Sequence, residues 1–110
     1  MTTATIYLIR ERWQLGNDQT RTGFVERDDT ETGLEATVWD LVNGCIECPL
    51  EVWALDVSDG TGTVRNVSGE IARAVANRLL HVGLDPDSNL LNFIQTHAGM
   101  EVANELERAA

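Results

Sequence analysis

Cys45 and Cys48, together with the only two histidines, His81 and His97, are the residues whose chemistry would be most specific. A CxxC pair can exchange disulfides when a helix N-terminus stabilises one thiolate. Here the pair is expected at the C-terminal end of a helix, and Glu47 lies between the two thiols. Both features disfavour a thiolate. We therefore predict free, non-redox thiols, with Cys45 in the core and Cys48 in a loop.

A zinc site usually takes four ligands from two close pairs. Cys45 and Cys48 supply one such pair, whereas His81 and His97 are far apart in sequence and are expected on different helices. A metal-binding protein or enzyme that uses these four residues stays an alternative, because the two helices would have to converge. No catalytic residue, metal ion or cofactor is predicted.

Acidic residues are the second chemical feature. Residues 26–59 hold ten carboxylates and one arginine, in a chain whose net charge is −10. A rigid cluster of carboxylates can imitate the spacing of phosphates and compete for an arginine- or lysine-lined groove, and a central tryptophan would be a binding hot spot. The predicted partner-binding residues are Asp28, Asp29, Glu31, Glu35, Trp39 and Asp40.

The charge pattern also excludes some classes of partner. All eight bases are scattered arginines, so direct binding to a nucleic acid backbone is not predicted. No apolar run is long enough to span a membrane. We expect a cytoplasmic protein from a bacterial cell or a phage-infected host, as a monomer or homodimer, whose partner is a basic, nucleic-acid-binding protein.

Phage anti-defence proteins (anti-CRISPR or anti-restriction) and bacterial immunity or antitoxin proteins are small, acidic, single-domain chains of this kind. The size and charge therefore predict a non-enzymatic inhibitor. The alternative is an accessory domain in which the acidity only maintains solubility.

The elements that would position these residues follow from hydrophobic periodicity. Strands are predicted at 3–13, 50–57 and 61–67, with a weaker strand at 20–26, and helices at 30–46, 69–82, 86–97 and 99–109. This order predicts an α+β fold: a single compact domain with a three- or four-stranded, mostly antiparallel sheet and helices packed on it.

The predicted strand 50–57 is apolar on both sides, with Leu50, Val52 and Ala54 on one face and Trp53, Leu55 and Val57 on the other. Such a strand is expected in the interior of a sheet, covered at least in part on both faces. In the strand 3–13, Ile6, Leu8 and Arg10 share one face, and Tyr7 and Ile9 share the other.

Helix ends are predicted from capping residues. Asp29 or Thr30 is expected to cap the helix 30–46, whose apolar stripe is Leu34, Val38, Leu41 and Cys45. Ser68 and Ser88 are expected to cap the following two helices. Gly83 is expected to end the helix 69–82 in a left-handed conformation.

Overall fold

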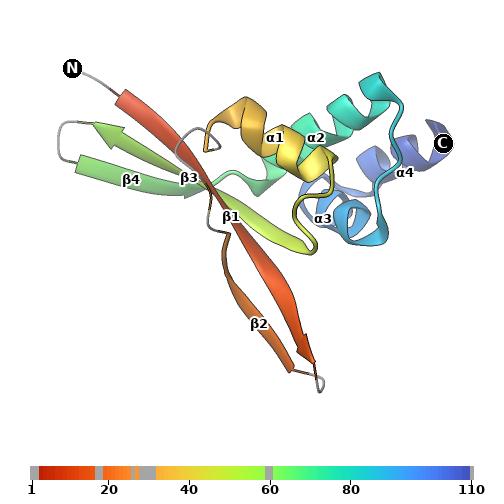
Figure 1. Ribbon diagram of the computed structural model, residues 1–110. Helices are drawn as coiled ribbons and strands as arrows, with labels where there is room; N and C mark the ends of the chain where they lie inside the picture. Colours follow the sequence, from red (N-terminus) through yellow and green to blue (C-terminus); the bar gives the residue numbers. More distant parts are fainter. Residues whose placement is uncertain (1–2, 17–18, 26, 28–31, 59–60, 110) are drawn as a thin grey trace.

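The fold is that of an α+β protein, as predicted. The computed structural model describes residues 3–16, 19–25, 27, 32–58 and 61–109 (Figure 1). The elements within these residues are β1 (Thr3–Gly16), β2 (Gln19–Phe24), α1 (Leu34–Val42), β3 (Pro49–Ser58), β4 (Thr61–Asn66), α2 (Ser68–Val82), α3 (Ser88–Ala98) and α4 (Met100–Ala109). The strands form one sheet in the order β2-β1-β3-β4, in which all neighbours are antiparallel.

Helix α1 is shorter than the predicted 30–46. Its N-cap is Gly33, which is extended and offers no side chain to the free amides. The predicted caps, Asp29 and Thr30, lie outside the described residues. At the other end the helix stops at Val42, and Gly44 adopts φ +72°, which turns the chain away. Cys45 is consequently exposed, so its predicted place in the core was wrong.

Ser68 does not cap α2, because its side chain forms a hydrogen bond with the sheet instead. The N-cap is Val67, and Ser68 begins the helix. The buried Ser68 Oγ accepts a hydrogen bond from Val52 N (2.9 Å), which links the first residue of α2 to β3. The prediction for Gly83 is confirmed: it has φ +73°, and its N–H donates to Leu79 O.

Helix α3 starts two residues later than predicted. Its cap is Asp87 rather than Ser88, because the Asp87 carboxylate accepts a hydrogen bond from Leu90 N (2.8 Å). The predicted break at Ala98–Gly99 is confirmed, since Gly99 has φ +102° and separates α3 from α4.

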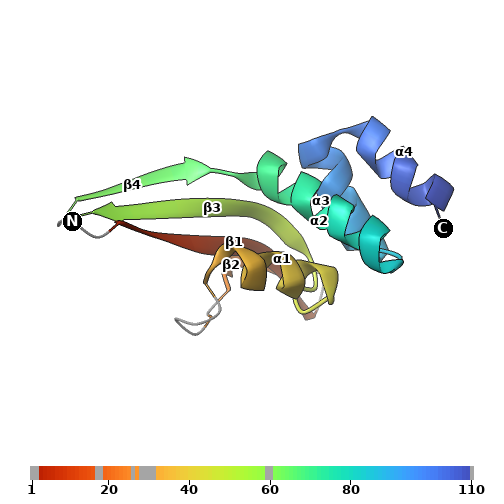
Figure 2. The same ribbon diagram turned by 90° about the horizontal axis from the view of Figure 1, so that it is seen from above.

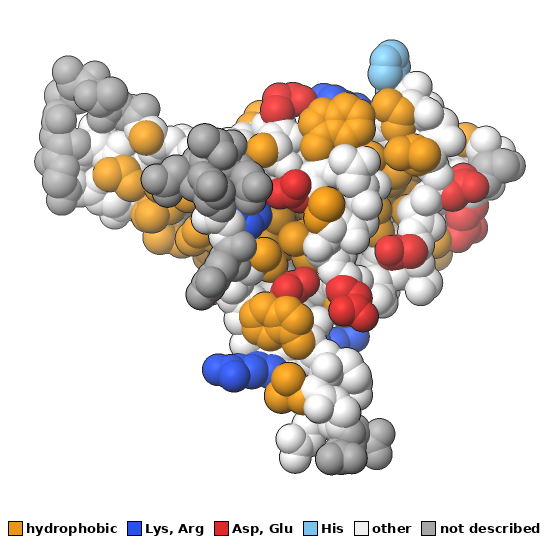
Figure 3. Space-filling view, in the orientation of Figure 1, with side chains coloured by type: hydrophobic (Ala, Val, Ile, Leu, Met, Phe, Trp, Pro, Cys, Tyr) orange, Lys and Arg blue, Asp and Glu red, His pale blue; other side chains and the backbone are white. Residues whose placement is uncertain are grey.

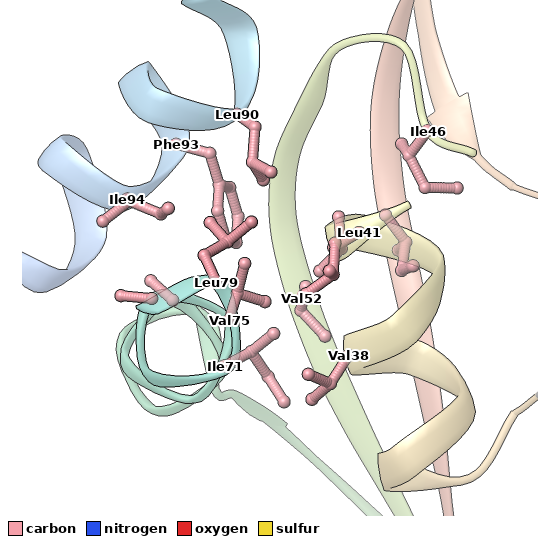
Figure 4. Packing of buried hydrophobic residues seen from close by; sticks show 14 of the residues in the cluster. Val38, Leu41, Ile46, Val52, Ile71, Val75, Leu79, Leu90, Phe93 and Ile94 are labelled. Atoms are coloured by element: carbon pink, nitrogen blue, oxygen red, sulfur yellow. The ribbon is translucent and has the colours of Figure 1, made fainter. Parts of the chain in front are cut away.

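The core lies between the helices and one face of the sheet. Ile9, Val52 and Ala54 on that face are fully buried. Figure 4 shows Val52 of β3 between α1, which contributes Val38 and Leu41, and α2, which contributes Ile71 and Val75. Helix α3 adds Phe93, which lies next to Leu79 of α2 (Figure 4). The sheet is therefore covered by helices on the face that carries Ile9.

Part of the sheet extends beyond the helices. The first half of β1 pairs with the second half of β3, which in turn pairs with β4. We call this portion, residues 3–8, 53–58 and 61–66, the wing. Figures 1 and 2 show the wing reaching away from the helices, while the β1–β2 hairpin extends in another direction.

A hydrogen-bonded carboxylate lies on the same face of the wing as Tyr7 and Ala54. Thr5 Oγ1 donates to Asp56 Oδ1 (2.7 Å), and Arg65 Nε donates to Asp56 Oδ2 (3.0 Å). The Thr5 hydrogen bond, and then that of Arg65, lowers the pKa of Asp56 below its ordinary value of 3.8. A lowered folded-state pKa stabilises the protein above the unfolded pKa, and this contribution is lost as the pH falls through the folded pKa.

We therefore expect Thr5→Val to be less stable than the parent at about pH 6, with a difference that shrinks below about pH 4. Thr63→Val is the control, because Thr63 faces Asp56 across the β3–β4 pair without a hydrogen bond to it among the described residues. Urea denaturation at the two pH values measures the effect. A difference for Thr5→Val that does not change with pH would contradict the assignment.

Candidate protein-binding surfaces

The first candidate surface is on α1, where the sequence predicted binding residues. Glu35 is exposed, and both of its carboxylate oxygens accept hydrogen bonds from Arg78 Nη2 of α2 (3.2 and 3.1 Å). The Arg78 guanidinium also lies over the Trp39 ring, 4.9 Å from its centroid. Trp39 is only partly exposed and packs against the core beneath Arg78. Its side chain therefore has a structural role on α1.

The second acid of α1 is also paired. Asp40 Oδ2 lies 3.2 Å from Arg27 Nη1. The Arg27 side chain is only 4% exposed, and it also donates to Thr37 Oγ1 (3.1 Å) and to the carbonyl oxygen of Tyr7. This arginine ties the chain before α1 to both β1 and α1.

The predicted surface is thus brought together only in part. Glu35, Trp39 and Asp40 lie on α1, whereas Asp28, Asp29 and Glu31 are outside the described residues. Arginines that come from other parts of the chain offset both described carboxylates. Glu35 and Asp40 therefore offer less free negative charge than their sequence indicated.

A second acidic surface was missed from the sequence. The α2–α3 connection and α4 enclose a hollow of about 120 Å³, lined by Asp85, Pro86, Leu91, Leu106 and Glu107, which we call the acidic groove. A smaller hollow beside it shares Asp85 and Leu106 and is bordered by Leu80 and Leu84, which are 39% and 47% exposed. The lining of the groove is therefore mostly apolar, and it includes the two acidic residues Asp85 and Glu107.

Within the described residues, the two carboxylates of the acidic groove have no basic partner. Asp85 and Glu107 are both exposed, and neither forms an ion pair within the part of the chain that the structure describes. Figure 3 shows acidic side chains over the helices on the right, where α4 lies. No local pattern joins Asp85 to Glu107, so this groove could not be predicted from the sequence.

The third surface is the face of the sheet that lacks helices. The register places Leu8 opposite Trp53, Ile6 opposite Leu55, and Leu55 opposite Val64. Opposite residues point to the same side, so these side chains share one face. We call this group the open sheet face; its members are Ile6, Leu8, Trp53, Leu55, Val57 and Val64. Figure 3 shows hydrophobic side chains on the wing at the left.

None of these six residues belongs to the buried core or packs against it, within the described residues. Val64 is 60% exposed and Val57 36%, while Ile6, Leu8, Trp53 and Leu55 are partly exposed. Strand β3 lies in the interior of the sheet, as predicted, and on the side of Trp53 it is covered only in part. Helices α1, α2 and α3 bury the opposite face.

The cysteines and histidines are not gathered into a metal site. No group of three or more histidine, cysteine, aspartate or glutamate side chains with suitable geometry occurs among the residues described. His97 Nε2 lies 2.7 Å from Leu50 O and must donate its proton there, since a carbonyl only accepts. Cys48 Sγ contacts Arg12 Nη2 at 3.4 Å, and His81 is exposed at the end of α2.

No helix in the described portion of the chain is long and apolar enough to cross a membrane. Comparisons with protein-family models, curated proteins and solved structures found no match to this chain.

Proposed function

We propose that this protein is a non-enzymatic inhibitor that occupies a basic surface of a nucleic-acid-handling protein, as anti-CRISPR, anti-restriction, immunity and antitoxin proteins do. The observation that carries the proposal is the acidic groove, where Asp85 and Glu107 flank an apolar floor. Such a groove suits a protein segment that presents an apolar side chain between arginines or lysines. We further propose that the encounter occurs in the cytoplasm of a bacterial or phage-infected cell.

Unpaired charge favours the acidic groove over α1 as the first contact. To bind a basic partner through Glu35 or Asp40, the protein would have to exchange an existing ion pair with Arg78 or Arg27 for a new one. Asp85 and Glu107 require no such exchange within the described residues. The net charge of −10 adds long-range attraction, which speeds encounter with a basic protein and weakens with salt.

The α1 surface remains part of the proposal as a second contact. Asp28, Asp29 and Glu31 precede it in sequence, and Glu35 and Asp40 lie on it. A partner arginine could replace Arg78 over the Trp39 ring if the Glu35–Arg78 pair opens. This second contact would require the Glu35–Arg78 ion pair to open, whereas the acidic groove is already formed.

The test is capture of a partner from lysate of a bacterial host by an immobilised Asp85→Lys/Glu107→Lys variant. We expect this variant to lose a basic protein that the parent captures, because the groove changes from negative to positive. The control is Glu47→Lys/Glu70→Lys, which changes the net charge equally. Glu47 and Glu70 are exposed, and Glu70 is at the opposite end of α2 from the groove.

Mass spectrometry identifies the captured protein and compares its amount between the variants. Capture by the parent should also fall steeply as salt rises from about 0.05 M to about 0.5 M, because the electrostatic screening length then shortens to a few ångströms. Equal capture by the groove variant and the control would contradict the assignment of this surface.

A further inference from the structure

We propose that Glu11 and Trp13, on the β1–β2 hairpin, form a binding site for an arginine side chain of the basic partner. The choice of occupant rests on the proposed function, whereas the site itself uses residues outside the acidic groove. Glu11 lies opposite Gly23 in the β1–β2 register, and Trp13 lies opposite Arg21 in the next row of the same face. The inference starts from the carboxylate of Glu11.

Glu11 is a buried acid without a basic partner in the described part of the chain. Only 7% of the residue is exposed, yet its side chain forms neither an ion pair nor a hydrogen bond with the residues that the structure describes. Among these residues no unpartnered side-chain oxygen is fully shielded from solvent, so the carboxylate oxygens of Glu11 reach the surface. Acids that are covered to this extent are almost always paired. Glu11 therefore offers its charge to a cation from outside.

The Trp13 ring lies beside this carboxylate and shields it from the nearest arginine of the hairpin. A Cβ atom added at Gly23 would be 2.9 Å from Trp13 Cζ3, so the indole leans across the hairpin over Gly23. This diagonal crosses the diagonal that joins Glu11 to Arg21. The indole therefore separates these two charges, which agrees with the lack of an ion pair between them in the described residues. Figure 3 shows acidic side chains next to a large hydrophobic side chain where the hairpin leaves the helices.

Helix α1 shows how an arginine fills such an arrangement. The Arg78 guanidinium lies 4.9 Å from the centroid of the Trp39 ring and donates to the Glu35 carboxylate. One guanidinium thus combines a cation–π contact with a charge-assisted hydrogen bond. Glu11 and Trp13 supply the same two groups, with Cα atoms about 7 Å apart along β1. This comparison selects arginine as the occupant of the hairpin site.

Titration with N-acetyl-arginine amide tests the site, followed by NMR of the isotope-labelled protein at low salt. We expect the signals of the Trp13 indole N–H and the Gly23 amide to shift, with a dissociation constant of about 1–10 mM for this single charged side chain. The matched probe is N-acetyl-citrulline amide, in which a neutral urea group replaces the guanidinium. At equal ionic strength we expect it to bind about tenfold more weakly, because it lacks the charge.

Glu11→Gln removes the negative charge and keeps the shape of the side chain. We expect this variant to bind the arginine probe about fivefold more weakly than the parent. Its urea midpoint of unfolding should be unchanged or higher, since no internal ion pair is lost. The control is Glu101→Gln, which should bind like the parent, because Glu101 is exposed on α4 and has no ion pair in the described residues.

Four results would overturn the site. They are an unshifted Trp13 signal at about 30 mM arginine probe, well above the expected dissociation constant, equal binding of the two probes, unchanged binding by Glu11→Gln, and a loss of stability in Glu11→Gln, which would reveal an internal partner. Shifts confined to residues 83–91 and 104–109 would place the probe in the acidic groove and count as the first of these results. The titration requires no partner protein, so a failure to capture a partner from lysate tests the proposed function separately.

Discussion

Replacement of Arg27 by methionine is expected to destabilise the protein by about 3 kcal/mol, the lower end of the range for breaking a buried ion pair. The Arg27 side chain is 4% exposed and serves three acceptors from different segments: Tyr7 O, Thr37 Oγ1 and Asp40 Oδ2. Methionine keeps an unbranched apolar chain of similar length but satisfies none of them. Thr37 retains its bond to Gly33 O (2.7 Å), so the loss falls on Tyr7 O and Asp40.

Chemical denaturation of the parent, Arg27→Met, Asp40→Asn and the double variant measures this effect. Asp40 is 27% exposed, so its single replacement should be milder than that of Arg27. The double variant should be more stable than the sum of the two single effects predicts, because the second change removes a carboxylate that has already lost its partner. Strict additivity would show that the Arg27–Asp40 pair contributes no coupling energy.

Replacement of Phe93 by alanine should destabilise the protein by about 3–5 kcal/mol, through lost burial and a cavity. Phe93 is 2% exposed and is among the largest fully buried side chains, where α3 packs behind α2. It also contacts the His97 ring, with centroids 4.9 Å apart. Its loss therefore weakens the contact that holds His97 near Leu50 and α3 against β3.

The matched control is Phe24→Ala, because Phe24 is 52% exposed on β2. This change should alter stability by less than about 0.5 kcal/mol. Thermal unfolding followed by circular dichroism compares the two variants. Equal loss of stability from both would contradict the placement of the core between α2, α3 and β3.

Local patterns in the sequence predicted the architecture well. Alternation in residues 3–13 and 50–57 identified the two central strands, and the register between Ile6–Arg10 and Glu51–Leu55 agrees with the predicted faces. Gly83 and Gly99 marked helix ends, because a left-handed or otherwise positive φ favours glycine. The helix caps were harder to predict. Ser68 was expected to cap α2, but its side chain accepts a hydrogen bond from Val52 N in the sheet, and Val67 is the N-cap.

Local patterns did not predict which face of the sheet the helices cover, or which charged side chains form ion pairs. An apolar face on each side of β3 does not tell which side the helices will bury, and helices α1, α2 and α3 cover the side of Val52. Likewise, Glu35 and Arg78 are distant in sequence, so the density of acids on α1 overstated its free charge. The acidic groove depends on the meeting of Asp85 with Glu107, which only the tertiary fold determines.

The most direct measurement of the central claim is an NMR titration of the isotope-labelled protein with the captured basic partner. Residues 83–91 and 104–109 surround the acidic groove. We expect their amide signals to shift or broaden first. Signals from Ile6, Leu8 and Leu55 on the open sheet face should stay unchanged. Perturbation confined to the open sheet face, with the groove signals unaffected, would contradict the assignment of the acidic groove as the partner-binding surface.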